Sequence, residues 1–176
     1  MGESLKPNLF AENSNTVRLV AATEAHFKWL LNPATITNSG LALPEGGLAD
    51  LSVIVTVRDI ARRVDSDRLR ATWLVVEAKV VVGLCGYKEA QDGNGEIEIG
   101  FNIAPCCQGR GLATRAVTLL TEHAANIPGL KAVRAETAVD NKASQAVLQK
   151  NGFHAVGSRI DVEDGKLILW KRIFRS

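Results

Sequence analysis

The chain is poor in cysteine and aromatic residues and has no long apolar run. Its three cysteines are an odd number, and Cys106 and Cys107 are adjacent, which is unlike the disulfide framework of a small secreted domain. No apolar run reaches the roughly 18 residues of a membrane span. The polar N-terminal segment lacks the apolar centre of a signal peptide. We therefore expect a cytoplasmic protein that is not bound to a membrane.

Strong charge and metal-binding patterns are also missing. A net charge of +2 over 176 residues provides no broad basic surface, so nucleic acid is not expected as a partner. The histidines His26, His123 and His154 are scattered, and no two cysteine pairs occur, so no metal site is predicted. Neither Cys106 nor Cys107 has a local base that would make it a nucleophile. The length is that of one domain, which we expect over residues 1–176.

Hydrophobic periodicity predicts an α/β (α+β) domain. Asp164-Gly165 is a hairpin turn pair, and the glycine-rich segment 92–95 predicts another turn. The segment 35–47 shows no steady period and is predicted to be a loop. The expected strands are 17–22, 72–77, 80–87, 96–103, 131–137, 155–162 and 166–173, and the expected helices are 24–31, 57–64, 114–125 and 142–151.

The most informative segment is a glycine-rich turn between a predicted strand and a predicted helix. It reads Gln108-Gly109-Arg110-Gly111-Leu112-Ala113. Its main-chain N–H groups lie at the positive end of a helix dipole, which suits a diphosphate, and glycine lets a ligand approach closely. Leu112 and Ala113 stand where a nucleotide-hydrolase loop needs Lys and then Ser or Thr, which argues against ATP or GTP hydrolysis. A dinucleotide fingerprint needs three glycines near the first strand, and this turn has two.

A second motif strengthens the first. Asn141, Ser144, Leu148, Lys150, Gly152 and Phe153 form the pattern N-x-x-S-x-x-x-L-x-K-x-G-F. Together with Gln108-x-x-Gly111-x-Ala113 and the strand Glu98-Ile99-Gly100-Phe101, this pattern resembles the GNAT N-acetyltransferase family. Within that family it is similar to the Rim-type branch, which acetylates ribosomal-protein N-termini. The resemblance is most specific over residues 73–155.

The resemblance implies both a fold and a cosubstrate. The fold is a single GNAT-like domain with a mixed, mostly antiparallel seven-stranded sheet, helices on both faces and splayed fourth and fifth strands. Gly100 is expected to form a bulge there. The cosubstrate is acetyl-CoA, with pantetheine in the gap and the N–H of Ile103 or a neighbour as oxyanion donor. The implied coenzyme-binding residues are Phe101, Asn102, Ile103, Gln108, Gly109, Arg110, Gly111, Leu112, Ala113, Asn141 and Ser144.

Three residues are candidates for the acid–base chemistry. Ser144 is the candidate acid for the leaving thiolate, because Gln149 and Lys150 stand where many relatives carry Tyr. Glu98 and Glu163 are alternative general bases: Glu98 matches the family strand, and Glu163 aligns with a Rim-type catalytic glutamate. As alternatives, Ser144, Glu98 and Glu163 are ordinary solvated side chains, and Asn141 is a helix cap.

The acceptor is expected to be a primary amine, on a protein N-terminus or a small molecule. At pH 7 an α-amine is roughly 10–15% neutral, whereas lysine is only about 0.04% neutral, so an α-amine needs less help from a base. An antibiotic or polyamine acetyltransferase remains an alternative, as does a non-catalytic module that binds acyl-CoA. The loop 35–47 and the last hairpin are expected to shape the acceptor pocket. The sequence leaves open whether the protein is a monomer or a homodimer.

Overall fold

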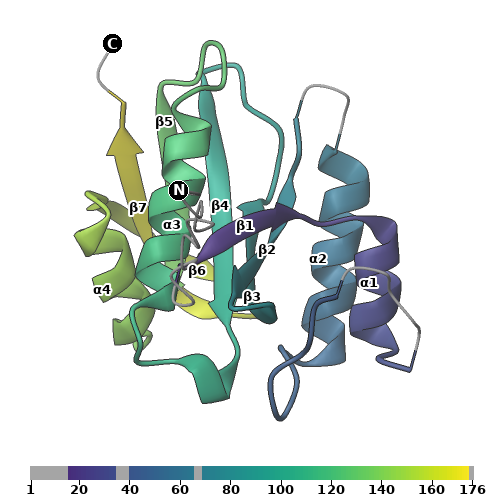
Figure 1. Cartoon of the computed structure of the whole chain (residues 1–176). Helices are drawn as coiled ribbons and strands as arrows, with labels where there is room; N and C mark the ends of the chain where they lie inside the picture. Colours follow the sequence, from purple (N-terminus) through teal and green to yellow (C-terminus); the bar gives the residue numbers. More distant parts are fainter. Residues whose placement is uncertain (1–15, 35–39, 66–68, 175–176) are drawn as a thin grey trace, which may run out of the picture.

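One open sheet organises the chain. The computed structural model describes residues 16–34, 40–65 and 69–174. The strand order is β1-β2-β3-β4-β5-β7-β6 (Figure 1), and among these described strands β4 and β5 are the one parallel pair. The predicted seven-stranded, mostly antiparallel sheet is confirmed. The strands are β1 (Arg18–Ala21), β2 (Thr72–Glu77), β3 (Val80–Tyr87), β4 (Glu96–Ile103), β5 (Ala132–Ala138), β6 (His154–Asp161) and β7 (Gly165–Ile173).

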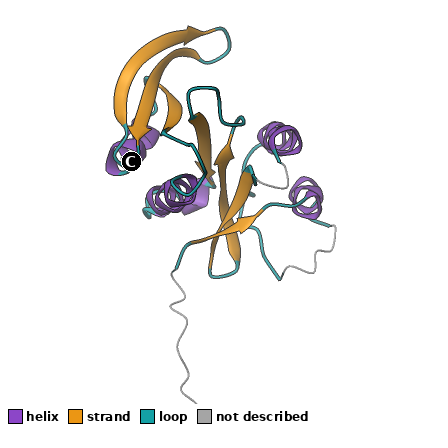
Figure 2. Ribbon diagram, turned by 90° about the horizontal axis from the view of Figure 1, so that it is seen from above, coloured by secondary structure: helices purple, strands orange, loops and turns teal. Residues whose placement is uncertain are grey.

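Helices cover both faces of the sheet, as predicted (Figure 2). They are α1 (Glu24–Leu31), α2 (Leu51–Val64), α3 (Leu112–Ala124) and α4 (Lys142–Lys150), with a short 3-10 helix at Pro105–Cys107 before the glycine-rich turn. Helices α1 and α2 pack together on one side, and α3 and α4 lie on the other. Within the described ranges, no helix has the length and apolarity that crossing a membrane requires.

Helix α2 begins earlier than the periodicity indicated, at Leu51 rather than at residue 57. Three apolar side chains in its first half, Leu51, Val53 and Val55, are 59%, 41% and 44% exposed. Because these three side chains are apolar yet exposed, the apolar pattern of the first turns does not follow one buried face of a helix.

The main core lies between α3 and the sheet. Ile97 and Ile99 of β4 are buried beneath α3, where Ala116, Val117 and Leu120 are buried as well. The apolar side chains alternate along β4 with half-buried polar ones, so one face of the strand packs and the other stays open. This packing fixes the position of β4 relative to the N-terminus of α3.

Strands β4 and β5 separate after a short parallel pairing. Their register runs from Glu96↔Ala132 to Glu98↔Arg134 and ends there, although both strands continue. The predicted bulge at Gly100 is wrong, because β3 and β4 stay in unbroken register through Gly86↔Gly100. Strand β5 instead pairs with β7 along its full length, so each strand follows a different neighbour and the twist of the sheet opens a gap between them.

Candidate active site

The glycine-rich turn folds as a helix N-terminus with an open main chain. Gly109 and Gly111 have φ values of +75° and +76°, a conformation that glycine adopts without steric cost, and Gly111 is the N-cap of α3. A Cβ atom at either glycine would meet no heavy atom within 4 Å. The Gln108 side chain donates a hydrogen bond of 3.0 Å to the carbonyl of Ile103, which ties the turn to the end of β4.

The main-chain amides of this turn are available to a ligand. Across the described part of the chain, the N–H groups of residues 109–113 donate no hydrogen bond to another group. The first intrahelical bond runs from the N–H of Arg115 to the carbonyl of Gly111. Unpaired N–H groups at a helix N-terminus, with the positive end of the dipole behind them, fit a diphosphate.

A cavity of about 480 Å³ extends from this turn to α4 and the freed end of β4. It brings together every predicted coenzyme-binding residue except Arg110. The Arg110 guanidinium turns away and binds Glu77 of β2 at 2.7 Å. The residues that line this cavity include Phe101, Asn102, Ile103, Gln108, Gly109, Gly111, Leu112, Ala113, Asn141, Ser144 and Lys150.

The gap side of β4 presents main-chain groups to this cavity. Ala104 donates to the carbonyl of Val82, and the carbonyl of Glu98 accepts from Lys88, so even-numbered residues of β4 direct their main chain toward β3. The main-chain groups of Phe101 and Ile103 therefore point to the β5 side, beyond the last β4–β5 pair. An N–H group at either position can face a ligand carbonyl in the gap.

Helix α4 forms the opposite wall of the cavity. The Asn141 Oδ1 accepts a hydrogen bond of 3.0 Å from the N–H of Ser144. Asn141 therefore caps α4, which is the alternative role that the sequence allowed. Within residues 16–34, 40–65 and 69–174, the Asn141 amide N–H groups and the Ser144 hydroxyl make no hydrogen bond of their own. Ser144 is half-buried and lines the cavity.

A second cavity of about 630 Å³ lies against the other side of β4. Phe101 and Asn102 line both cavities, so β4 separates two chambers that meet at this point. The walls of the second cavity come from α2, from β3 and β4, and from the β6–β7 turn with Glu163 and Asp164. This arrangement can place two molecules on either side of one strand.

Comparison with known proteins agrees with this geometry. The sequence profile of the acetyltransferase (GNAT) domain matches residues 16–154. The chain belongs to the GNAT acetyltransferase family. A relative in Bacillus licheniformis, the uncharacterised N-acetyltransferase p20, is 29% identical over 97 residues, which are 55% of this chain. The chain spans about half of that relative, 54% of its length.

Solved structures of other acetyltransferases share the fold. The ribosomal-protein α-N-acetyltransferase RimL in complex with coenzyme A has a TM-score of 0.67 and 22% identity, covering 90% of this chain and 94% of its own. The Vibrio cholerae spermidine N-acetyltransferase with coenzyme A and spermine gives 0.62 and 17%, covering 89% and 95%. An aminoglycoside acetyltransferase with coenzyme A gives 0.65 and 16%, covering 90% and 95%. These likenesses establish the fold.

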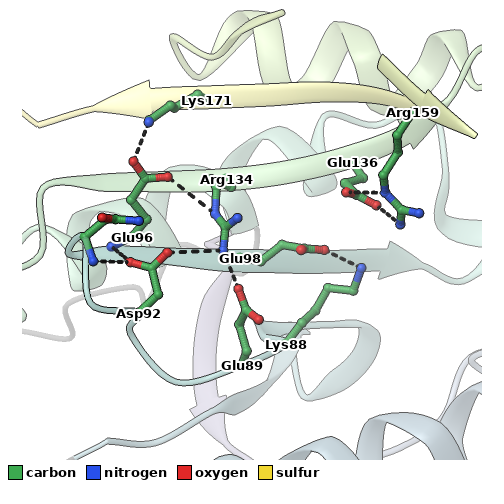
Figure 3. Close-up of polar contacts among 10 residues, drawn as sticks. Lys88, Glu89, Asp92, Glu96, Glu98, Arg134, Glu136, Arg159 and Lys171 are labelled. Carbon is green, nitrogen blue, oxygen red and sulfur yellow. Dashed lines mark hydrogen bonds and ion pairs between the residues drawn. The ribbon is translucent and has the colours of Figure 1, made fainter. Parts of the chain in front are cut away.

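The two candidate bases differ in their relation to the second cavity. Glu163 lines the second cavity. Glu98 lies on the open face of β4, where its carboxylate binds the Lys88 ammonium at 2.5 Å, and it is not among the residues that line the cavity (Figure 3). Lys88, which binds Glu98, itself lines that cavity. The two acids therefore have different surroundings.

An arginine holds the turn that carries Glu163. Arg159 of β6 binds Glu136 through two hydrogen bonds of 2.9 and 2.6 Å (Figure 3) and binds Asp161 at 2.5 Å. The Asp161 Oδ1 accepts from the N–H groups of Glu163 and Asp164 at 3.0 and 3.2 Å. Hydrogen bonding to Arg159 lowers the pKa of Glu136 and lowers that of Asp161 to about 2.

Two features of the site were missed at the level of sequence. The part of α2 that lines the second cavity was missed because exposed apolar residues in its first turns obscure the helical periodicity. The Arg159 contacts were missed because they join residues of two different strands, β5 and β6. Strand β7 lies between β5 and β6, so these pairs depend on a strand order that the sequence does not reveal. The loop residues 40–47, expected to shape the acceptor pocket, do not line the second cavity. Residues 35–39 lie outside the described residues.

The cysteines near the turn have no catalytic environment. Cys107 is buried, and this burial raises the pKa of its thiol, which disfavours the nucleophilic thiolate. The exposed Cys106 donates a hydrogen bond of 3.2 Å to the carbonyl of Glu45. Among residues 16–34, 40–65 and 69–174, no group of three or more His, Cys, Asp or Glu side chains is arranged to hold a metal ion.

Proposed function

We propose that the chain transfers the acetyl group of acetyl-CoA to a primary amine by direct attack of the amine on the thioester. The observation that carries this proposal is the row of unpaired N–H groups over residues 109–113, opening into a cavity that meets a second one at Phe101 and Asn102. Two chambers that share one strand suit two substrates that react directly. The buried Cys107 thiol offers no competing route through a covalent enzyme intermediate.

The coenzyme side of the site has the groups that the resemblance requires. The amides of residues 109–113 would hold the diphosphate, and the free amide group of Asn141 would donate to pantetheine while its oxygen caps α4. Acetyl-CoA supplies an activated acyl thioester. The N–H of Ile103, or that of Phe101, would stabilise the developing oxyanion, and one such donor is worth about 3 kcal/mol in a dry site.

For the proton transfers we propose Ser144 as the acid for the leaving thiolate and Glu163 as the general base. Ser144 lines the coenzyme cavity with an unengaged hydroxyl, and Glu163 lines the second cavity. Glu98 would act less directly, because Lys88 engages its carboxylate and lies nearer the second cavity. The acceptor would be a protein N-terminal α-amine or a small-molecule amine, and RimL, which acts on a ribosomal protein, represents the first kind.

A thiol-release assay with acetyl-CoA tests the activity. We expect coenzyme A to appear on addition of an acceptor from a panel of N-terminal peptides, amino acids, polyamines and aminoglycosides. Coenzyme binding without thiol release from any acceptor would identify the protein as a non-catalytic acyl-CoA-binding module instead.

The two candidate bases are compared by Glu163→Gln and Glu98→Gln. Removing a general base lowers the rate by about 10²–10⁴-fold, so Glu163→Gln should lower kcat/KM by this factor and abolish the fall in rate at acidic pH. Glu98→Gln should retain that acid limb. If only Glu98→Gln removed it, the base assignment would pass to Glu98.

A further inference from the structure

The second cavity carries information about the chemistry of the acceptor. We infer that the acceptor is an apolar molecule or segment that bears one cationic amine, and not a polyamine or an aminoglycoside. The inference rests on the proposed function, because it concerns the second substrate of the same site. A cavity of about 630 Å³ has the size of a site for a small organic molecule or a short peptide segment.

The wall that α2 contributes is uncharged. Ser52, Val53, Thr56, Val57 and Ile60 line the cavity, at helical spacing along one side of the helix. The three basic residues of the same helix, Arg58, Arg62 and Arg63, do not line the cavity, and Arg58 and Arg62 both bind Glu24 of α1. An ammonium group placed against this wall would lose water and find only the Ser52 and Thr56 hydroxyls as partners, with no carboxylate to balance its charge.

The carboxylates of the described lining residues come from one turn. Of the described lining residues, Glu163 and Asp164 are the acidic ones, and both belong to the β6–β7 turn. The contacts of Arg159 and Asp161 fix this turn, so the two carboxylates form a localised negative site. A polyamine has ammonium groups spread along its length and needs acids spread along its site.

The floor of the cavity is partly bare main chain. Gly86 and Gly100 face each other across β3 and β4, and both line the cavity. A Cβ atom at Gly100 would make ordinary contacts of 3.5 and 3.6 Å with the Lys88 stem. The Lys88 stem therefore lies over this part of the floor, and α2 supplies an uncharged wall of the same cavity. The uncharged α2 wall and the carboxylates confined to the β6–β7 turn together favour an acceptor with one amine attached to an apolar body.

The experiment compares four acceptors with acetyl-CoA, measured as kcat/KM by thiol release. Phenylethylamine and the C-terminal amide of a Leu-Gly dipeptide carry one amine and no carboxylate, and spermidine and kanamycin carry several amines. We expect the first two to exceed the last two by about tenfold or more, given the cost of an unpaired buried cation. The dipeptide and phenylethylamine arms show whether the source is a peptide N-terminus or a small amine.

Two matched variants test the uncharged wall itself. Val53 lines the cavity and is 41% exposed, whereas Val55 is 44% exposed on the same helix and does not line it. Val53→Asp should shift the ratio of kcat/KM for spermidine over phenylethylamine upward by about tenfold, and Val55→Asp should leave that ratio unchanged. Both variants should keep the coenzyme affinity of the wild type.

The outcomes separate this inference from the proposed function. Faster acetylation of spermidine or kanamycin by the wild type, or an unchanged ratio in Val53→Asp, would overturn the inference while the transferase activity stands. Absence of coenzyme binding, or of thiol release from all four acceptors, would overturn the proposed function and the inference with it.

Discussion

At the scale of single residues, two glycines keep the turn at the start of α3 open. Gly111 combines a φ of +76° with empty space beyond its α-carbon, and it precedes the first residue of α3. A side chain at this position would fill the space where a diphosphate meets the amides. Gly129 has a similar φ of +78° but follows the other end of α3, far along the helix from the turn.

The pair Gly111→Val and Gly129→Val separates backbone strain from ligand exclusion. Each variant should lose about 1–3 kcal/mol of unfolding free energy, because valine is strained at positive φ. Only Gly111→Val should also lose coenzyme binding, measured by titration of the folded protein. Equal coenzyme affinities in the two variants would mean that the turn has a structural role alone.

Asn141 has two roles that substitution can distinguish. Its oxygen caps α4 through Ser144, and its amide faces the coenzyme cavity. Asn141→Asp keeps a capping oxygen and removes the donor, so it should retain stability and lose coenzyme affinity. Asn141→Ala should in addition lose about 1 kcal/mol of unfolding free energy. Denaturant unfolding and coenzyme titration check both, and wild-type affinity in Asn141→Asp would leave the cap as its whole role.

At the scale of elements, the β6–β7 hairpin is anchored by ion pairs whose strength depends on pH. Arg159 lowers the pKa of Asp161 from 3.8 to about 2 and lowers the pKa of Glu136. A carboxyl with a lowered folded-state pKa stabilises the fold above its unfolded pKa, and this contribution disappears as the pH falls through the folded value. The stabilisation by Arg159 is therefore complete above the ordinary carboxyl range and lost as the pH falls from 3.8 toward about 2.

Arg159→Gln should lower the unfolding free energy at neutral pH, and the difference from the wild type should shrink between pH 3.8 and about 2. Arg58→Gln is a control, because it removes the partner of another carboxyl, Glu24, whose pKa Arg58 also lowers to about 2. Only Arg159→Gln should raise KM for the amine, since only Arg159 anchors the turn at the second cavity. An unchanged KM would show that the hairpin needs no such anchor.

At the scale of the whole molecule, local sequence pattern predicted the helices and strands better than it predicted which of them contact one another. The strands and the glycine-rich turn follow from periodicity and turn residues, because these signals act over a few neighbouring residues. The start of α2 could not be predicted, since Val53 and Val55 are apolar yet exposed. That Glu163 lines the second cavity, and Glu98 does not, depends on where the β6–β7 turn lies relative to β4, which no local pattern encodes.

Coenzyme binding should stabilise the whole fold, because its cavity joins β4, α3 and α4 across the opening in the sheet. A ligand that binds only the folded state adds about 2.7 kcal/mol at 100 times its Kd. Thermal unfolding with increasing coenzyme A should show a steadily rising Tm. The Gly111→Val variant should show no rise, and a parallel rise in both proteins would locate the coenzyme elsewhere.

The main-chain amides of residues 109–113 donate no hydrogen bond within the described residues, and we propose that they hold the diphosphate of the coenzyme. Amide hydrogen exchange, followed residue by residue with and without saturating coenzyme A, is the decisive measurement. We expect fast exchange at these five positions in the free protein and strong slowing once coenzyme A is bound. Amides that are already protected in the free protein, or that exchange equally fast with coenzyme A present, would contradict it.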